Sequence, residues 1–250
     1  MTSNEPIAYL GIPSGLSPTV IVMMHGNVPF LKQMIKHFTS FGISFNLRAD
    51  LELAMDQLQK KYDQDYGTNK RQLTLIDHSL WLFLIQEANI EYEHPDSLEN
   101  SLKRSLLDLA VIDRNLAAAK LIIKKFGTEI LNHRCTEGPL QGNCLRFIEG
   151  DLNMLKLLVA NGVDINTPMN ITTVYEGSDE SESLKFVKET PVLARLLSMD
   201  YDGPMIEYVK TLNFSQKVVE TALDFARKMH FVICAQVATD ILWEKYEIRA

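Results

Sequence analysis

The sequence predicts an all-α protein made of short helical hairpins that stack on one another, a helical solenoid. Two observations predict this class: short apolar runs broken by a few polar residues recur along the chain, and a longer apolar run follows each break. The 250 residues are 46% hydrophobic and 23% charged, which is enough apolar material for a substantial core. A single hairpin of this size cannot bury its own apolar face, so neighbouring hairpins must cover it.

Four segments of the chain share this layout and superpose without gaps. They are residues 17–35, 105–123, 141–159 and 221–239, with polar breaks at 25–27, 113–115, 149–151 and 228–230. In "SLLDLAVIDRNLAAAKLII" (105–123), for example, Asp113-Arg114-Asn115 separates two apolar runs. Each segment predicts a short helix, a turn of two or three residues and a longer second helix.

The segment "DLNMLKLLVANGVDIN" (151–166) shows how a second helix of this kind should begin and end. Asp151 precedes the apolar stripe and offers a side-chain cap, and Gly162 stands where the helix should stop. We expect Gly162 to adopt the left-handed conformation that glycine accepts without strain. Asp164 and Asn166 should then begin the connection to the next hairpin.

Two further hairpins are less regular. The segment "ETPVLARLLSMDYDGPMIEYVKTL" (189–212) predicts one with a longer central turn at 198–204. In 48–92, "DLELAMDQLQKKY" followed by "LIDHSLWLFLIQEANI" occupies the position of another, and Asp77 should cap the helix that carries Trp81. The aromatic pairs Phe38/Phe41 and Trp81/Phe83 are most simply core residues.

The repeated unit resembles the ankyrin repeat, whose sequence runs T-P-L-H-x-A, a turn glycine, a second helix of the V-V-x-L-L type, and then G-A-D-V-N. Residues at the T-P position are Ser17-Pro18, Thr190-Pro191 and Thr221-Ala222, and Gly26 and Gly150 stand at the turn glycine. "KLLVANGVDIN" (156–166) is similar to the end of the family's second helix.

This resemblance implies a domain organisation and a function. Residues 1–104 would hold divergent helical repeats, and residues 105–250 would hold ankyrin-like repeats with an insertion at 167–189. The family implies a non-catalytic protein–protein interaction module that needs no cofactor. Divergent repeats in a short acidic chain also resemble the ankyrin-bearing effectors that intracellular bacteria deliver into host cells. The inserted segment is longer than a normal connection between repeats. Connections of this length are usually either functional or disordered, and of these two alternatives we favour disorder.

Ankyrin proteins bind partners through loop tips and the residues just before each turn, on the concave face of the stack. By this resemblance, the partner-binding residues would be Met24, His25, Ile112, Asp113, Ile148, Glu149, Lys228 and Met229, joined by His133, Arg134 and Glu137 from the loop 132–138. The set mixes apolar side chains with both charges. This mixture indicates a protein partner rather than a phosphate backbone.

An alternative interpretation concerns the first hundred residues. The runs "PTVIVMM", "ISFNLRA" and "LTLIDH" are rich in β-branched residues and are separated by helical stretches, so they could be strands of a small α/β domain. Such a domain, followed by ankyrin-like repeats for targeting, would make the protein an enzyme or a nucleotide-binding protein. A phosphate-binding loop rich in glycine is absent, however, since Gly26 stands alone.

Composition excludes several other classes. The formal net charge of -7 argues against a general nucleic-acid binder, which needs clustered Lys and Arg. Three cysteines are too few for a disulfide framework and indicate a reducing compartment. We see no secretory signal and no apolar stretch long enough to span a membrane, so we expect an intracellular protein, with delivery into a host cell as the alternative that the effector resemblance implies.

No arrangement of reactive side chains predicts catalysis or metal binding. His133, Cys135 and Cys144 lie close in sequence, but they lack a fourth ligand for zinc. Cys135 could be paired with His133 or His94, yet no feature of the sequence would lower the pKa of its thiol. Asp77, His78 and Ser79 are adjacent and therefore point in different directions, whereas a catalytic triad converges from separate positions. We therefore predict that the protein is not an enzyme.

Overall fold

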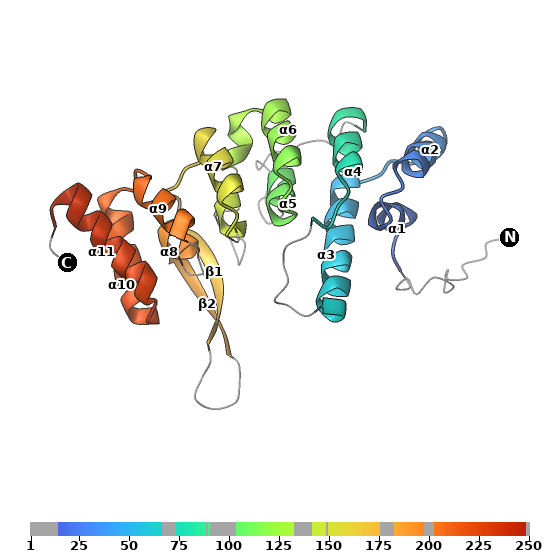
Figure 1. The fold of residues 1–250 in the computed structure, drawn as a ribbon. Coiled ribbons are helices and arrows are strands. Elements are labelled where there is room, and N and C mark those ends of the chain that lie inside the picture. Colours follow the sequence, from blue (N-terminus) through green and yellow to red (C-terminus); the bar gives the residue numbers. More distant parts are fainter. Residues whose placement is uncertain are drawn as a thin grey trace. The chain divides into compact units, whose positions relative to one another are not determined.

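The computed structural model describes residues 15–66, 74–88, 90, 104–132, 142–148, 150–175, 183–197 and 203–248 (Figure 1). These residues are mainly helical, as predicted, and include one two-stranded antiparallel sheet. The chain divides into two compact units: residues 1–91 together with 113–121, and residues 92–112 together with 122–250. Each unit is described by itself below, and the domain boundary at 104 stays a prediction.

Four α-helices and a π-helical turn lie within residues 15–90 of the first unit, to which residues 113–121 also belong. They are α1 (Pro18–Met24), α2 (Val28–Thr39), α3 (Leu47–Tyr66), α4 (His78–Leu82) and η2 (Phe83–Glu87). Helix α1 packs against both α2 and α3. The hydroxyl groups of Ser17 and Thr19 donate to the Asp50 carboxylate at 3.2 and 2.6 Å, which joins the start of α1 to α3. Trp81 and Phe83 are buried, as predicted.

The structure contradicts the strands on which the α/β alternative for the first hundred residues rested. "PTVIVMM" is helix α1. Residues 43–46 and 74–77 form no strand, and helices begin directly after them at Leu47 and His78. The β-branched residues of α1 are instead helical because Ser17 caps the helix and Pro18 stands at its first position. Between residues 15 and 90, the described residues contain no strand.

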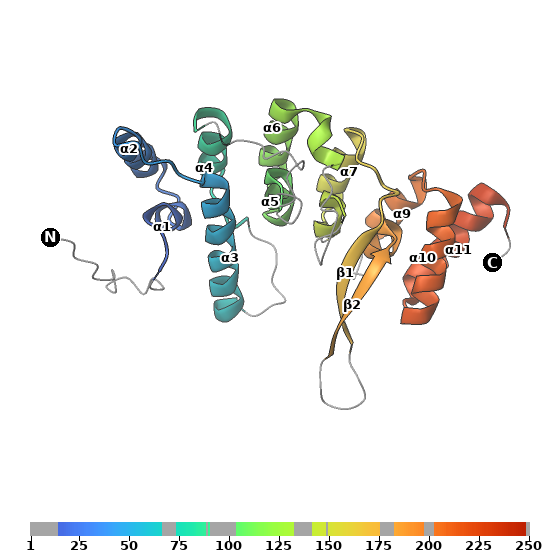
Figure 2. The ribbon, with the colours of Figure 1, turned by 180° about the vertical axis from the view of Figure 1, so that it is seen from behind.

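The second unit holds most of the remaining elements, shown from two sides in Figures 1 and 2. They are α5 (Leu106–Ile112), η3 (Thr128–Asn132), η5 (Cys144–Phe147), α7 (Leu152–Ala160), β1 (Met169–Tyr175), β2 (Ser183–Thr190), α8 (Val192–Leu196), α9 (Gly203–Thr211), α10 (Gln216–Met229) and α11 (Val232–Tyr246). Helix α6 (Leu116–Phe126) crosses the division between the units.

Successive first helices of the hairpins contact one another within the second unit. Helix α5 contacts η5, η5 contacts α8, and α8 contacts α10. The Arg195 side chain of α8 reinforces this series, because its Nε donates to the Arg146 carbonyl of η5 at 3.1 Å. The last hairpin is closed by extensive packing of α10 on α11. The series thus follows the order of the chain.

The hairpin turns share one backbone conformation. The tenth residue of each gapless segment has a positive φ: 63° at Gly26, 53° at Arg114, 75° at Gly150 and 60° at His230. After three of these turns the next residue caps the second helix, since the side chains of Asn27, Asn115 and Asp151 accept backbone N–H groups three residues further on. The cap predicted at Asp151 is therefore confirmed.

The left-handed glycine predicted at the end of α7 is also confirmed. Gly162 has φ 91°, its N–H donates to the Val159 carbonyl at 3.0 Å, and the Val163 N–H donates to the Leu158 carbonyl at 3.1 Å. These are the two bonds of a Schellman cap, which satisfies carbonyls at the end of a helix.

The loop that follows Gly162 joins three parts of the second unit. Asn132 at the end of η3 accepts the Asp164 N–H at 2.7 Å, and Asn143 donates to the Asp164 carbonyl at 2.9 Å. The Asn166 side chain accepts the N–H of Ser215, the capping residue of α10, at 2.8 Å. Asp164 and Asn166 thus connect preceding and following elements, as their place in the sequence predicted.

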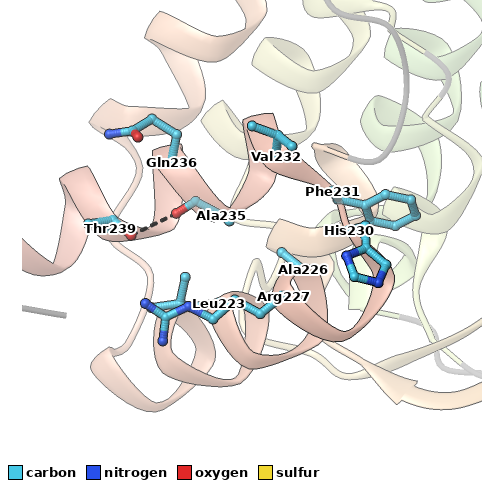
Figure 3. Close-up of a pocket in the computed structure, with 9 residues that line it drawn as sticks. All are labelled: Leu223, Ala226, Arg227, His230, Phe231, Val232, Ala235, Gln236 and Thr239. Atoms are coloured by element: carbon cyan, nitrogen blue, oxygen red, sulfur yellow. Dashed lines mark hydrogen bonds between the residues drawn. The ribbon is translucent and has the colours of Figure 1, made fainter.

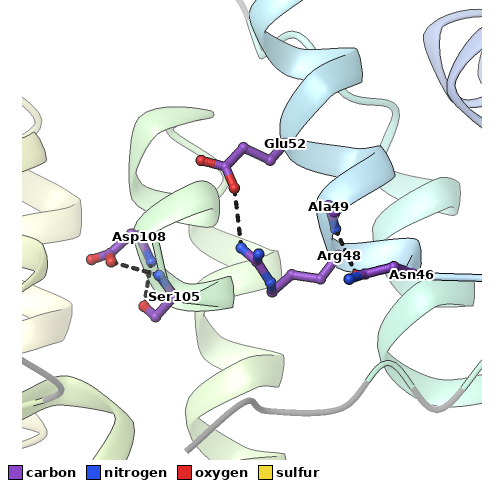
Figure 4. A network of polar contacts seen from close by, with 6 residues as sticks. All are labelled: Asn46, Arg48, Ala49, Glu52, Ser105 and Asp108. Carbon is purple, nitrogen blue, oxygen red and sulfur yellow. Dashed lines mark hydrogen bonds and ion pairs between the residues drawn. The ribbon is translucent and has the colours of Figure 1, made fainter. Parts of the chain in front are cut away.

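Helix starts elsewhere are fixed in the same local way (Figure 4). At the start of α3, the Asn46 side chain accepts the Ala49 N–H at 3.0 Å, and one turn later Arg48 pairs with Glu52 at 3.1 Å. At the start of α5, Ser105 Oγ accepts the Asp108 N–H at 3.0 Å while the Asp108 carboxylate accepts the Ser105 N–H at 2.7 Å. The latter pair is a capping box.

Three local predictions are wrong. The inserted segment was expected to be disordered, but its described residues form the antiparallel pair β1–β2, with Ile171 opposite Val187, because β-branched residues such as Ile171 and Val174 favour strands. Thr221 does not start a helix, since α10 already begins at Gln216. The first helix of the 141–159 segment is a single 3-10 turn at Cys144–Phe147, since Gly142 precedes it and the chain is extended again at Ile148.

Candidate interaction surfaces

The shared turn conformation brings the predicted partner-binding residues to equivalent places, just before the left-handed residue. His25 is exposed and Met24 is half-buried before Gly26. Before His230, Lys228 is exposed and Met229 is half-buried. Ile112 is half-buried at the end of α5. These five side chains are accessible to a partner, within their separate units.

Two predicted partner-binding residues are not accessible, which corrects the sequence-based assignment. Asp113 is 1% exposed and Ile148 is 2% exposed. Ile148 belongs to the core of the second unit because the chain turns inward after η5. Glu149, His133, Arg134 and Glu137 lie outside the described residues.

Asp113 has a structural task in the first unit. One carboxylate oxygen accepts the backbone N–H groups of Leu75 and Ile76 at 2.6 and 3.1 Å. The other accepts the indole N–H of Trp81 at 2.7 Å. Burial raises the pKa of Asp113 to about 6, although these donors favour the ionised form. The residue before Arg114 therefore anchors the segment 75–81 and is not a binding residue.

The residues that were considered for catalysis also have local structural tasks. The Asp77 carboxylate accepts the Ser79 N–H at 2.7 Å and the Ser79 hydroxyl, and these bonds lower its pKa. Asp77 thus caps α4, as predicted. Burial raises the pKa of the Cys144 thiol well above its usual value and that of Cys234 to about 12, so both thiols stay protonated.

Neither a metal centre nor a membrane span is found in the described part of the chain. No three His, Cys, Asp or Glu side chains gather there in a way that could hold a metal ion. Among the helices that the structure describes, none combines the length and the apolar character needed to cross a bilayer.

An aromatic surface of the first unit was not predicted. Phe38 and Phe41 were expected to be core residues, but Phe41 is 70% exposed and Phe38 is 36% exposed. His37 packs edge-on against both rings, with centroids 5.6 and 5.1 Å away. Phe30 and Ile43 are also exposed. Helix α2 buries only Leu31 and Met34, and its aromatic side chains Phe30 and Phe38 are exposed.

A pocket of about 370 Å³ opens beside the α10–α11 turn (Figure 3). Its apolar lining residues are Leu223, Ala226, Phe231, Val232 and Ala235, and its polar ones are Arg227, His230, Gln236 and Thr239. The sequence did not predict this pocket, because its lining residues come from two separate helices. The gapless superposition does set His230 opposite Gly26, and so it indicates that the turn lies at His230.

Comparisons of the chain with protein-family models, with curated proteins and with solved structures gave no match.

Proposed function

We propose that this chain is a non-catalytic protein–protein interaction module built from divergent ankyrin-like repeats. One observation carries the proposal: within the second unit, the first helices α5, η5, α8 and α10 contact one another in chain order. Such a series is what stacked hairpins require, because each hairpin leaves an apolar face that the next must cover.

The turns support the same proposal. Four segments place a left-handed residue at the same position, and the loop 162–167 links consecutive elements through Asn132, Asp164 and Ser215. A repeated turn of this kind places the side chains before it at the same position within each segment. In repeat proteins such places form the binding surface.

The chemistry of the described residues favours binding over catalysis. Asp77 is used as a helix cap, Asp113 as a buried anchor, and the thiols of Cys144 and Cys234 are buried and free. Free thiols are typical of a reducing compartment, so we extend the proposal to a protein that works inside a cell. The mix of His25, Met24, Lys228 and Met229 before the turns fits a protein partner.

Affinity capture with the immobilised full chain tests the proposal. The double variant His25→Asp with Lys228→Glu changes two exposed pre-turn residues. Gln33→Asp with Lys60→Glu is the matched control, since it makes the same change in charge at exposed sites away from the turns. We expect mass spectrometry to identify proteins that wild type and control retain and that the pre-turn variant retains about tenfold less.

Two results would overturn the proposal. The first is that no protein is retained above an unrelated bait. The second is that the pre-turn variant retains the same proteins in the same amounts as wild type.

A further inference from the structure

The pocket beside the α10–α11 turn has the size of a side-chain site. Its volume of about 370 Å³ lies at the lower end of pockets that hold whole small ligands, which measure about 300–1,000 Å³. The hollow exists because alanines face it from both helices, Ala226 on α10 and Ala235 on α11 (Figure 3). It therefore has room for one or two side chains of a partner.

The walls of the pocket are apolar. Leu223 and Ala226 are buried at its base, whereas Val232 at the start of α11 is 78% exposed. The exposed β-branched side chain of Val232 favours an apolar guest, because the guest removes that surface from water.

Among the residues that line the pocket, Arg227 carries the formal charge, and it is positive. No Asp or Glu lines the pocket, and His230 adds a polar imidazole ring. Figure 3 shows the Arg227 guanidinium on the Leu223 side of the pocket and the His230 imidazole at the turn. Arg227 and Lys228 at the end of α10 both interact favourably with the helix dipole. This interaction alone does not explain the place of Arg227, because Lys228 has it too and does not line the pocket. In a chain of net charge -7, a lining whose formal charge is the positive charge of Arg227 selects for a carboxylate.

His230 adopts φ 60° in its turn, as Arg114 does with φ 53° in the equivalent turn, whereas the turns at 26 and 150 have glycine. A side chain in this conformation carries a backbone cost that glycine avoids. The imidazole that this conformation presents lies at the rim of the pocket.

From these observations we propose that the pocket binds a segment of a partner protein in which an aliphatic or aromatic side chain stands next to Asp or Glu. This proposal rests on the proposed function and names the partner chemistry of one turn. The apolar side chain enters between Leu223 and Val232, and the neighbouring carboxylate pairs with Arg227, whose planar guanidinium can donate two parallel hydrogen bonds. His230 supplies a further hydrogen bond at the turn.

Selection from a library of displayed random heptapeptides against the full chain tests the proposal. We expect the selected peptides to carry Asp or Glu beside Leu, Ile or Phe. Their synthetic, fluorescein-labelled forms should then bind in fluorescence anisotropy. Raising the salt concentration should weaken this binding, because salt screens exposed charges.

Two pairs of variants separate the pocket from its surroundings. Val232→Asp should weaken peptide binding at least about tenfold, while Ile233→Asp, the exposed neighbour that does not line the pocket, should leave it unchanged. Both new carboxylates fall in the first turn of α11, where a negative charge is favourable, so both variants should fold. Arg227→Glu should likewise weaken binding at least about tenfold, with Lys217→Glu, an exposed change on the same helix, as the control.

His230→Gly separates binding from structure. It should weaken peptide binding severalfold while the thermal stability of the chain rises or stays the same, since glycine accepts this conformation. A loss of binding that only follows a loss of stability would overturn the role of the imidazole.

The remaining outcomes are distinguishable. Selected peptides without the acidic and apolar pair, or peptides that bind Arg227→Glu and Val232→Asp as well as wild type, overturn this proposal and leave the interaction module standing. Self-association of the chain that is lost in Val232→Asp identifies a second copy as the occupant and also overturns it. Failure of both peptide selection and affinity capture overturns the proposed function as well.

Discussion

The α5–α6 and α10–α11 turns have the same backbone and different uses. Their left-handed residues, Arg114 and His230, have φ 53° and 60°. The residue before Arg114 is Asp113, which is buried and anchors Trp81, whereas the residue before His230 is the half-buried Met229, beside a pocket. The same turn conformation therefore accompanies a buried side chain in one segment and a half-buried side chain in the other.

The largest expected effect is the removal of the anchor. Asp113→Ala leaves the Trp81 indole N–H and two backbone N–H groups without their acceptor, so we expect the free energy of unfolding to fall by about 3 kcal/mol. Met229→Ala, at the equivalent place, should cost about 1 kcal/mol or less. Urea unfolding followed by tryptophan fluorescence measures both, and equal losses would remove the distinction between the two turns.

The pH dependence of the free energy of unfolding provides a second test of the Asp113 anchor. The pKa of Asp113 is raised from 3.8 to about 6, so its titration favours the folded state below pH 4, and this contribution is lost as the pH rises through 6. The stability of wild type relative to Asp113→Asn should therefore fall by about 2 kcal/mol over this range. Urea unfolding at several pH values measures it.

Asp77→Asn is the control for the pH series, because the sign is reversed at Asp77. Its pKa is lowered in the folded state, so its contribution is present above pH 4 and is lost as the pH falls. A wild-type advantage over Asp113→Asn that grows with rising pH would contradict the assignment of Asp113.

The smallest expected effect concerns the left-handed residue itself. Gly26→Ala should destabilise by about 1 kcal/mol, since a Cβ there takes on the cost of a positive φ. His230→Gly should stabilise by about 0.5–1 kcal/mol for the opposite reason. Thermal unfolding of the two variants checks the signs, and a shift in the same direction for both would show that the two turns are not equivalent.

Features that depend on neighbours in sequence could be predicted. The caps at Asp77 and Asp151 and the left-handed Gly162 were all correct, because each is decided within about four residues. The order helix, turn, helix within 17–35, 105–123 and 221–239 was also predicted, although α10 begins earlier than expected, since apolar periodicity and a polar break are local signals.

Features that depend on distant partners could not be predicted. The burial of Asp113 follows from Trp81, which lies 32 residues earlier in the chain. The exposure of Phe38 depends on which face of α2 meets α1, and the sequence of α2 is apolar on more than that face. The pocket beside His230 needs two alanines on separate helices, which no single segment reveals.

The buried thiols of Cys144 and Cys234 have a practical consequence. Both are shielded and protonated in the folded chain, so an alkylating reagent can modify them only during an excursion that uncovers them. In a background with Cys135→Ser, the rates of alkylation at these two sites would time such excursions at η5 and at α11 separately. The alkylation rates of these two native cysteines thus measure local opening without any added label.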